Sequence, residues 1–265
     1  MGRVLFSDDF NGPLDPGKWS VNTSYPNAPS GNPAYLGLTY MRQSLPSASG
    51  GVARIQLDTW NFDWQDGKSF FGSEAITRQG WDAQSNGGVA FQANLQFLNV
   101  PGGMIAGFFF YQQFPPPSKD APRSPHNELD FEVFTSSLQA AKPISTNVYT
   151  HDGGGDGDLN YPISYPGPSP LEWHTYRIEW LPNKVTWLID GNPIRTETET
   201  GRLPQPAVPQ QLHLNLWGVP TNWGPSPGDP GGPPIGNPGF VPAGNQSQNA
   251  TYFFNVAKVL VETLS

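Results

Sequence analysis

The sequence predicts an all-β fold in which two antiparallel sheets pack face to face as a sandwich. Short segments that are apolar, or that alternate apolar with polar residues, recur along the chain between turn residues. No stretch of 12 or more residues keeps a helical period, and the 265 residues include 30 glycines and 30 prolines. This combination is typical of many short strands joined by structured loops, as sandwich architectures have.

Ten segments have the pattern of strands. In chain order they are residues 3–10, 51–60, 89–100, 103–114, 127–135, 144–151, 173–181, 184–191, 211–218 and 252–264. A hairpin is predicted across Pro182 and Asn183, with a second turn at Asp190 and Gly191. Residues 224–244 are about two-thirds Gly and Pro. We interpret them as a long surface loop, because the residues that follow are too few for another domain. One domain is therefore expected over residues 1–265.

Composition limits the classes of partner. The net charge is −8 and no basic stripe is visible, which argues against nucleic acid and anionic membrane surfaces as partners. The longest apolar run, "MIAGFFFY", is too short to span a bilayer. The absence of cysteine excludes disulfides, thiolate catalysis and Cys-ligated zinc. A neutral polymer is compatible with this composition, and "MGRVLF" does not have the pattern of a signal peptide.

Three acids stand in the segment "HNELDFEVF", residues 126–134. On a strand, Glu128, Asp130 and Glu132 share one face, and the apolar residues between them share the other. Alternating acids are most simply explained as a solvated strand face. However, like charges at this spacing repel one another, so the arrangement costs stability unless a function requires it.

Glycoside hydrolysis with retention is one such function. It uses two carboxyls about 5–5.5 Å apart, one as a nucleophile and one as a general acid. Residues four apart on a strand have Cα atoms about 13 Å apart, so two long Glu side chains must lean toward each other. Crowding keeps a proton on one carboxyl near neutral pH. A metal cluster is the competing use of such acids, but no complementary ligands adjoin the segment.

The segment resembles the active-site strand of glycoside hydrolase family 16, whose motif is E-[IL]-D-x-E. Further similarities follow in the family's order: "LFSDDFNGPLDPGKW", "STNVYTHDGGG", "EWHTYRIEWLPNKVTWLIDGNPIRT" and "LHLNLWG". The resemblance implies a β-jelly roll of two curved sheets with a concave substrate cleft. It also implies Glu128 as the nucleophile, Asp130 as the assisting aspartate and Glu132 as the general acid/base.

The resemblance also indicates residues that bind substrate. Glu74 matches a sugar-binding glutamate, although Ile76 stands where an arginine is expected. Asn147 and Tyr149 share a strand face after the acids, and His126 precedes Asn127 where the xyloglucan enzymes have His-Asp. Seven residues are thus expected to contact sugar: Glu74, His126, Asn147, Tyr149, Asn215, Trp217 and Trp223.

Other tryptophans are open to two interpretations. Trp60, Trp64 and Trp81 lie near loops and could stack on sugar rings. Trp173, Trp180 and Trp187 are assigned to the core. Members of the family often bind one calcium on the convex face through a C-terminal aspartate. Here Asn255 stands at that point, so no metal site is predicted beyond a weak structural calcium, and no cofactor is required.

These observations predict a secreted, monomeric, retaining endo-β-glucanase for β-1,3-1,4-glucan or a related glucan. The motif lacks the one-residue insertion that laminarinases and agarases have, which favours a glucan with β-1,4 linkages. A xyloglucan- or laminarin-active hydrolase or transglycosylase is the alternative among enzymes. The cysteine-bearing C-terminal extension of plant xyloglucan transferases is missing, so hydrolysis is favoured. A non-catalytic lectin on the same fold would gain nothing from three crowded carboxyls.

Overall fold

A computed structural model describes residues 2–21, 35–98, 100–113, 126–138, 142–150, 159–160, 162–226 and 229–264. Strands dominate these residues, and the helices among them are three single turns of 3₁₀ helix: η1 (Thr135–Ser137), η2 (Thr200–Arg202) and η3 (Gln246–Gln248). Within this described part, no helix has the length and hydrophobicity that a bilayer crossing requires.

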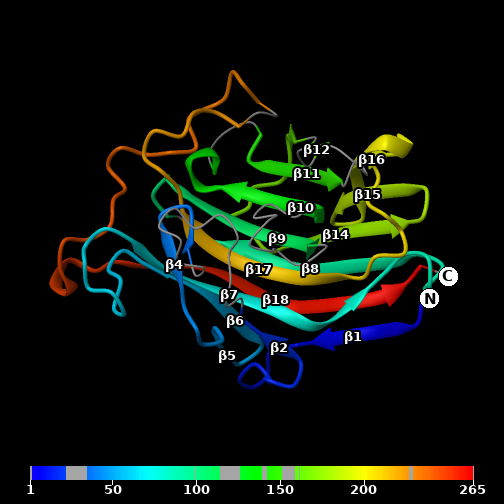
Figure 1. The fold of residues 1–265 in the computed structure, drawn as a ribbon, viewed down its shortest axis with the longest axis horizontal. Helices are drawn as coiled ribbons and strands as arrows, with labels where there is room; N and C mark the ends of the chain where they lie inside the picture. Colours follow the sequence, from blue (N-terminus) through cyan, green and yellow to red (C-terminus); the bar gives the residue numbers. More distant parts are fainter. Residues whose placement is uncertain are drawn as a thin grey trace, which may run out of the picture.

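One sheet, here called sheet I, carries the three acids. Its order is β2–β7–β17–β9–β10–β11, and β12 and β13 both pair with β11. Its strands are β2 (Trp19–Ser20), β7 (Phe70–Trp81), β9 (Met104–Gln113), β10 (His126–Phe134), β11 (Ile144–Thr150), β12 (Leu159–Asn160), β13 (Ile163–Tyr165) and β17 (Gln210–Gly218). These pairings are antiparallel, and β10 has a partner on each side (Figure 1).

The second sheet, sheet II, has the order β5–β6–β18–β8–β14–β15–β16, with β1 also paired to β18. Its strands are β1 (Val4–Asp8), β5 (Ser47–Ser49), β6 (Val52–Asp58), β8 (Val89–Phe97), β14 (His174–Leu181), β15 (Lys184–Ile189), β16 (Asn192–Glu197) and β18 (Thr251–Thr263). Because β1 and β18 pair, the two chain ends lie side by side (Figure 1).

Strand β7 joins the two sheets. It pairs with β17 in sheet I and, at its first residues, with β6 in sheet II. The short strands β3 (Tyr35–Leu36) and β4 (Thr39–Met41) extend this junction, and β4 pairs with β7 in parallel. The long strands curve along the molecule (Figure 1). The predicted fold class, an all-β sandwich of two curved antiparallel sheets, is confirmed.

The core fills the space between the sheets with aliphatic and aromatic side chains from both. From β10, Leu129, Phe131 and Val133 point into it. Phe131 meets the ring of Tyr176 from sheet II edge-on, with centroids 5.3 Å apart. Trp187 of β15 is fully buried beneath β10 and donates a hydrogen bond from Nε1 to the Asp130 carbonyl oxygen at 2.9 Å. The apolar face of the acidic strand is therefore what fixes it to the second sheet.

All ten predicted strand segments contain a strand, and both predicted turns are present. The β14–β15 hairpin pairs Leu181 with Lys184 across the predicted turn, and Asp190 and Gly191 both have positive φ, as a tight turn requires. The segment 224–244 precedes β18 as expected, but it is not only a surface loop. Phe240 is buried and stacks on Phe70 with centroids 4.8 Å apart. Strand β7 was not among the predicted strands.

The tryptophan assignments need one correction. Trp180 and Trp187 are fully buried, as predicted, but Trp173 is 42% exposed because it lies just before β14 begins and outside the sandwich. Three further tryptophans lie near loops and were considered for stacking on sugar rings. Trp60 and Trp81 are buried, and Trp64 is 51% exposed.

Candidate active site

The three acids lie together on the face of β10 that is turned away from the core. Glu128 and Glu132 are half-buried, and Asp130 is 3% exposed. Pairing from His126 to Phe134 runs against β9 without a register shift, so β10 has no bulge in this segment. The regular alternation of the sequence is therefore preserved in the strand, and the predicted division into an apolar and an acidic face is confirmed.

Strand register determines which side chains surround the acids, since directly paired residues of an antiparallel ladder point to the same face. On β11, Tyr149 pairs with Glu128 and Asn147 pairs with Asp130. These two predicted substrate residues thus flank the acids, as their spacing indicated. His126 is the first residue of β10 and pairs with Gln113 of β9.

On the other side of β10, strand β9 presents Tyr111, Phe109 and Gly107 opposite Glu128, Asp130 and Glu132, respectively. The space that a side chain at Gly107 would fill is taken by the Asn215 amide and the Phe109 ring. Residues 104–111 of β9 are in turn paired with β17, so the row of side chains continues across sheet I.

Strands β17 and β7 complete this row. Glu74 is 1% exposed and pairs in register with Asn215, whose Nδ2 lies 3.5 Å from Glu74 Oε1. His213 Nδ1 lies 3.0 Å from the same oxygen. The His213 ring stacks on Phe109, with centroids 4.8 Å apart. Both predicted residues, Glu74 and Asn215, therefore lie on the face that carries the acids, two to three strands away from them.

Burial and mutual repulsion change the protonation of the acids. Burial, with the neighbouring charge of Glu128, raises the pKa of Glu132 to about 8. Burial raises the pKa of Asp130 well above its usual range, and the charges of Glu128 and Glu132 and a hydrogen bond with Glu128 add to the shift. Buried Arg195 opposes that rise. With a pKa of about 8, Glu132 keeps its proton at neutral pH, and burial contributes more to this than the crowding that the sequence indicated. The pKa of Tyr149 is also raised, chiefly by burial.

The two predicted tryptophans differ in exposure. Trp217 is 9% exposed and belongs to a second apolar cluster that includes Ile105, Phe134 and Val219. Trp223 is 38% exposed, and its ring meets Trp217 edge-on at 5.7 Å. Trp217 therefore acts partly as a core residue that supports Trp223, and Trp223 presents the more accessible ring.

Sequence reasoning missed His213, Phe109, Tyr111 and Gly107. The signal for His213 was present, because it stands two residues before Asn215 in "LHLNLW" and so shares its face. The other three stand on β9, and only its pairing with β10 identifies them.

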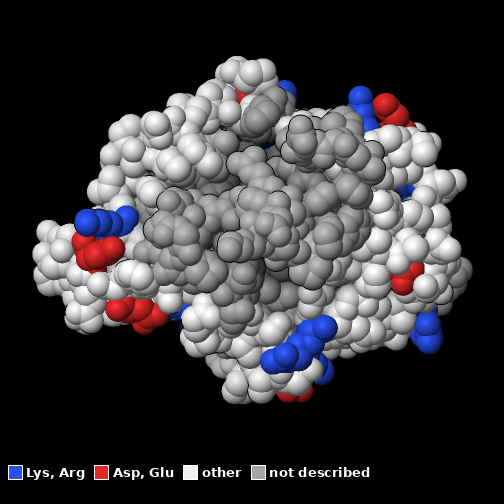
Figure 2. Space-filling view, in the orientation of Figure 1, with Lys and Arg blue, Asp and Glu red and all other residues white. Residues whose placement is uncertain are grey.

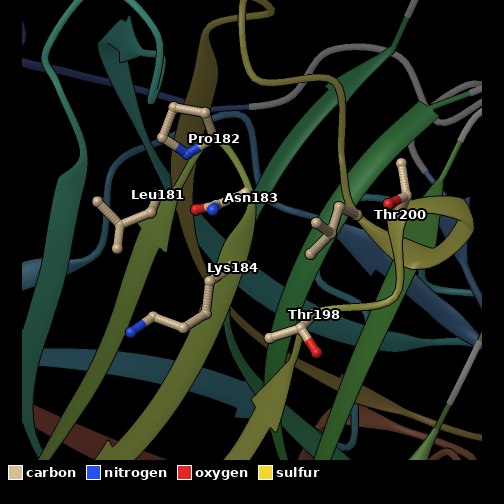
Figure 3. A pocket seen from close by; sticks show the side chains of 7 residues that line it. Leu181, Pro182, Asn183, Lys184, Thr198 and Thr200 are labelled. Carbon is tan, nitrogen blue, oxygen red and sulfur yellow. The ribbon is translucent and has the colours of Figure 1, made fainter.

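A pocket of ≈ 600 Å³ lies elsewhere, at the turn between β14 and β15 (Figure 3). It is lined by Leu181, Pro182, Asn183, Lys184, Thr198, Thr200 and Leu203. No carboxylate is in this lining, so the pocket lacks the groups that acid–base hydrolysis needs. On the face shown in Figure 2, the Lys, Arg, Asp and Glu side chains of the described residues lie near the rim and are intermixed.

The described residues contain no group of three or more His, Asp or Glu side chains arranged to hold a metal ion. At the expected calcium position, Asn255 Nδ2 lies 3.3 Å from Gln96 Oε1. An amide that is already paired is a weaker ligand than a carboxylate. The expectation of weak or absent calcium binding stays a prediction.

Comparison with known proteins places these features in context. Residues 72–229, more than half of the chain, match the family model of glycosyl hydrolases family 16. A β-glucanase from Fibrobacter succinogenes is 28% identical over 150 residues, which cover 57% of this chain and 39% of that protein. Xyloglucan endotransglucosylase/hydrolase protein 22 of Arabidopsis thaliana is 28% identical over 120 residues, covering 40% and 41%. The chain thus matches about two fifths of the length of these relatives.

Among solved structures, a prokaryotic β-1,3-1,4-glucanase (lichenase) derived from a mouse hindgut metagenome superposes with a TM-score of 0.64. The sequence identity is 18%, and the superposition covers 98% of this chain and 99% of that one. At this identity the likeness establishes the sandwich fold.

Proposed function

This chain belongs to glycosyl hydrolases family 16, and from that premise we propose that it is a retaining endo-β-glucanase acting on β-1,3-1,4-glucan or a related β-glucan. The observation that carries the proposal is the placement of Glu128, Asp130 and Glu132 on one face of β10, with the pKa of Glu132 raised to about 8. A group with that pKa is protonated at neutral pH and is thus a general acid.

In the proposed reaction, the Glu128 carboxylate attacks the anomeric carbon while the bond from that carbon to the leaving oxygen breaks. Glu132 donates its proton to this oxygen and becomes a carboxylate. It then takes a proton from water, whose oxygen attacks the same carbon and releases Glu128. Glu132 is thereby protonated again, and the configuration at the anomeric carbon is retained after two inversions.

Asp130 has a supporting role in this scheme. It lies between the two glutamates and hydrogen-bonds Glu128, and its raised pKa favours the protonated form. In this scheme a protonated Asp130 donates to the Glu128 carboxylate, which orients the nucleophile without adding a second negative charge beside it. The buried Arg195 beneath the sheet limits how far the pKa of Asp130 rises.

Sugar rings of the substrate would lie across the outer face of sheet I. Asn147 and Tyr149 would contact them on one side of the acids, and Glu74 and Asn215 on the other. The half-exposed ring of Trp223, supported by Trp217, offers an apolar platform for a pyranose face. We place His126, at the start of β10, at the margin of the same site.

The unbulged β10 supports the proposal of a glucan containing β-1,4 linkages. The similarity to a xyloglucan endotransglucosylase/hydrolase keeps a xyloglucan-active enzyme, or transfer instead of hydrolysis, as the second candidate. A laminarin-active hydrolase is the further alternative. We propose that the protein acts as a secreted monomer on polysaccharide, without nucleic-acid or membrane partners and without a required cofactor.

A reducing-sugar assay on barley β-glucan tests the proposal. The wild type should release sugar and the Glu128→Gln variant should not. Glu172→Gln, at an exposed position before β14, is the control and should keep full activity. Equal release by wild type and Glu128→Gln would remove the catalytic assignment, and sugar binding without release by the wild type would favour a lectin.

A panel of lichenan, laminarin, xyloglucan and agarose then identifies the substrate. We expect the highest rate on lichenan. Products longer than the starting oligosaccharide, separated by chromatography, would favour transglycosylation.

A further inference from the structure

His213 is a buried histidine on the outer face of sheet I, and the proposed reaction does not use it. It is 5% exposed and lies in the row that runs from Asp130 through Phe109 to β17. Phe109 stacks on one face of its ring, and Tyr111 meets it edge-on with centroids 5.5 Å apart. Two aromatic contacts therefore fix the plane of the imidazole.

One edge of the imidazole is directed at Glu74. His213 Nδ1 lies 3.0 Å from Glu74 Oε1, and Asn215 Nδ2 approaches the same oxygen at 3.5 Å. A carboxylate that is 1% exposed needs donors in place of water, and here the imidazole and the amide are two of them. Since the carboxylate oxygen accepts, Nδ1 carries the proton in this contact. The direction of the Glu74 carboxylate thus depends on His213.

The amide of Asn215 lies beside Gly107 of β9. A Cβ on Gly107 would lie 2.8 Å from Asn215 Oδ1, so the missing side chain lets this amide oxygen lie over β9. Asn215 Oδ1 is buried and has no hydrogen-bond partner among the described residues. A buried unpaired acceptor is costly in free energy, and such groups in native proteins call for an explanation. Gly107 itself pairs with Glu132 on its other side.

We infer that His213 is a positioning residue for substrate. It holds the carboxylate of Glu74 and, through that shared oxygen, the amide of Asn215, so that two oxygen acceptors stand side by side near Glu132. Hydroxyl groups of a pyranose ring are the donors that match two adjacent acceptors. This inference rests on the proposed function, because it assigns how the same site orients a sugar next to the scissile bond.

The test compares two substitutions at one position. His213→Asn places an amide nitrogen where Nδ1 stands, whereas His213→Leu removes the donor. We expect His213→Leu to raise KM for barley β-glucan about tenfold, with kcat within about threefold, because the lost contact orients bound sugar rather than reacting atoms. His213→Asn should return KM to within about threefold of the wild-type value.

The chain offers a matched control. His174 pairs with an acid in the same way, with Nδ1 2.6 Å from Asp190 Oδ2, but it lies on sheet II. His174→Leu should leave KM unchanged. Wild-type KM in His213→Leu, or an equal rise of KM in the Leu and Asn variants, would overturn the inference.

A binding measurement separates this inference from the proposed function. In the Glu128→Gln background, calorimetry with a mixed-linkage β-glucan tetrasaccharide should give a Kd about tenfold higher when His213→Leu is added. The proposed function fails if the wild type releases no sugar. The inference fails if the tetrasaccharide binds equally well with and without the imidazole.

Discussion

At the scale of single residues, the environment of Glu132 decides its chemistry. Burial is the larger cause of its raised pKa, and the charge of Glu128 is the second. A carboxyl in water would be ionised at neutral pH and could not serve as an acid. Glu132 acquires its proposed role from strands β9 and β11, which flank it, and from Glu128, four residues earlier on the same face of β10.

The pH dependence of the reaction follows from this pKa. The ratio kcat/KM on barley β-glucan should fall above about pH 8, where Glu132 of the free enzyme loses its proton. The Glu132→Gln variant should lose roughly 10²–10⁴-fold in rate. Initial rates between pH 5 and 10 test this, with circular dichroism at each pH as the check on folding. Activity that stays level to pH 10 in a folded protein would contradict it.

Stability should depend on pH through the same group. The native state holds the Glu132 proton up to about pH 8, whereas the unfolded chain releases it near 4.5. A rise in pH from 4.5 to about 8 therefore lowers the free energy of unfolding, and this loss is complete near pH 8. The free energy of unfolding of the wild type should fall relative to that of Glu132→Gln across this pH range. Urea titrations at pH 5 and 9 measure it, and parallel pH curves would refute the assignment.

The acids could be identified from sequence at this scale, but much of their surroundings could not. Alternation alone put Glu128, Asp130 and Glu132 on one face. Phe109 and Gly107 lie near them only because β9 pairs with β10 in one register, and a shift of one residue would turn both away. That register depends on packing across the whole sandwich, and the residues of the two strands do not specify it by themselves.

At the scale of elements, β10 is held on three sides. Strands β9 and β11 pair with it at the edges, and Trp187 bonds to the Asp130 carbonyl oxygen from beneath. Arg195 lies over the Trp187 ring at 4.6 Å and also donates to the Thr146 carbonyl oxygen of β11. The inner layer therefore fixes the backbone that carries the acids.

A pair of substitutions tests the hydrogen bond from the Trp187 indole to the Asp130 carbonyl oxygen. Trp187→Phe removes a hydrogen bond to the Asp130 carbonyl, and Trp180→Phe removes an indole N–H that has no hydrogen-bond partner in the described part of the chain. Both tryptophans are fully buried, so the cavities are similar. We expect Trp187→Phe to destabilise by about 1–3 kcal/mol more than Trp180→Phe. Urea denaturation measures the difference, and equal losses would show that the bond contributes nothing.

Eight of the described strands were not predicted from the sequence, and β7 and β16 among them were missed for physical reasons. Residues 70–77 of β7 are buried on both faces, so no alternation marks them, and Gly72 and Gly80 interrupt the run. Strand β16 begins with Asn192-Pro193, and a proline is accepted there because β16 is at the edge of its sheet. The strands that were predicted are those with a clear period or a strong apolar run.

At the scale of the whole molecule, the chain ends and the long loop complete the sandwich. Strand β18 lies between β6 and β8 and also pairs with β1, and Phe240 of the preceding loop packs on Phe70. Asp58 of β6 joins this region to neighbouring segments through hydrogen bonds with Arg42, Asn249 and Thr251. These strand pairings, ring contacts and hydrogen bonds therefore stabilise the region where the two sheets meet.

Calcium should add little to this stability. Asn255 provides an amide where a carboxylate would be the stronger ligand, and it contacts Gln96. Adding a chelator should change the melting temperature by less than about 2 °C, which is under roughly 1 kcal/mol for a protein of this size. Thermal scans with chelator and with added calcium measure this. A fall of several degrees that calcium reverses would reveal a structural site.

The most direct test of the account is to locate the covalent intermediate. A 2-deoxy-2-fluoro cellobiosyl fluoride slows release of the sugar from a retaining enzyme, so the glycosyl-enzyme accumulates and peptide mass spectrometry can identify the modified residue. The account predicts one added disaccharide on Glu128 and none on the Glu128→Gln variant. A sugar attached to Glu132, or an enzyme that hydrolyses β-glucan with inversion, would contradict it.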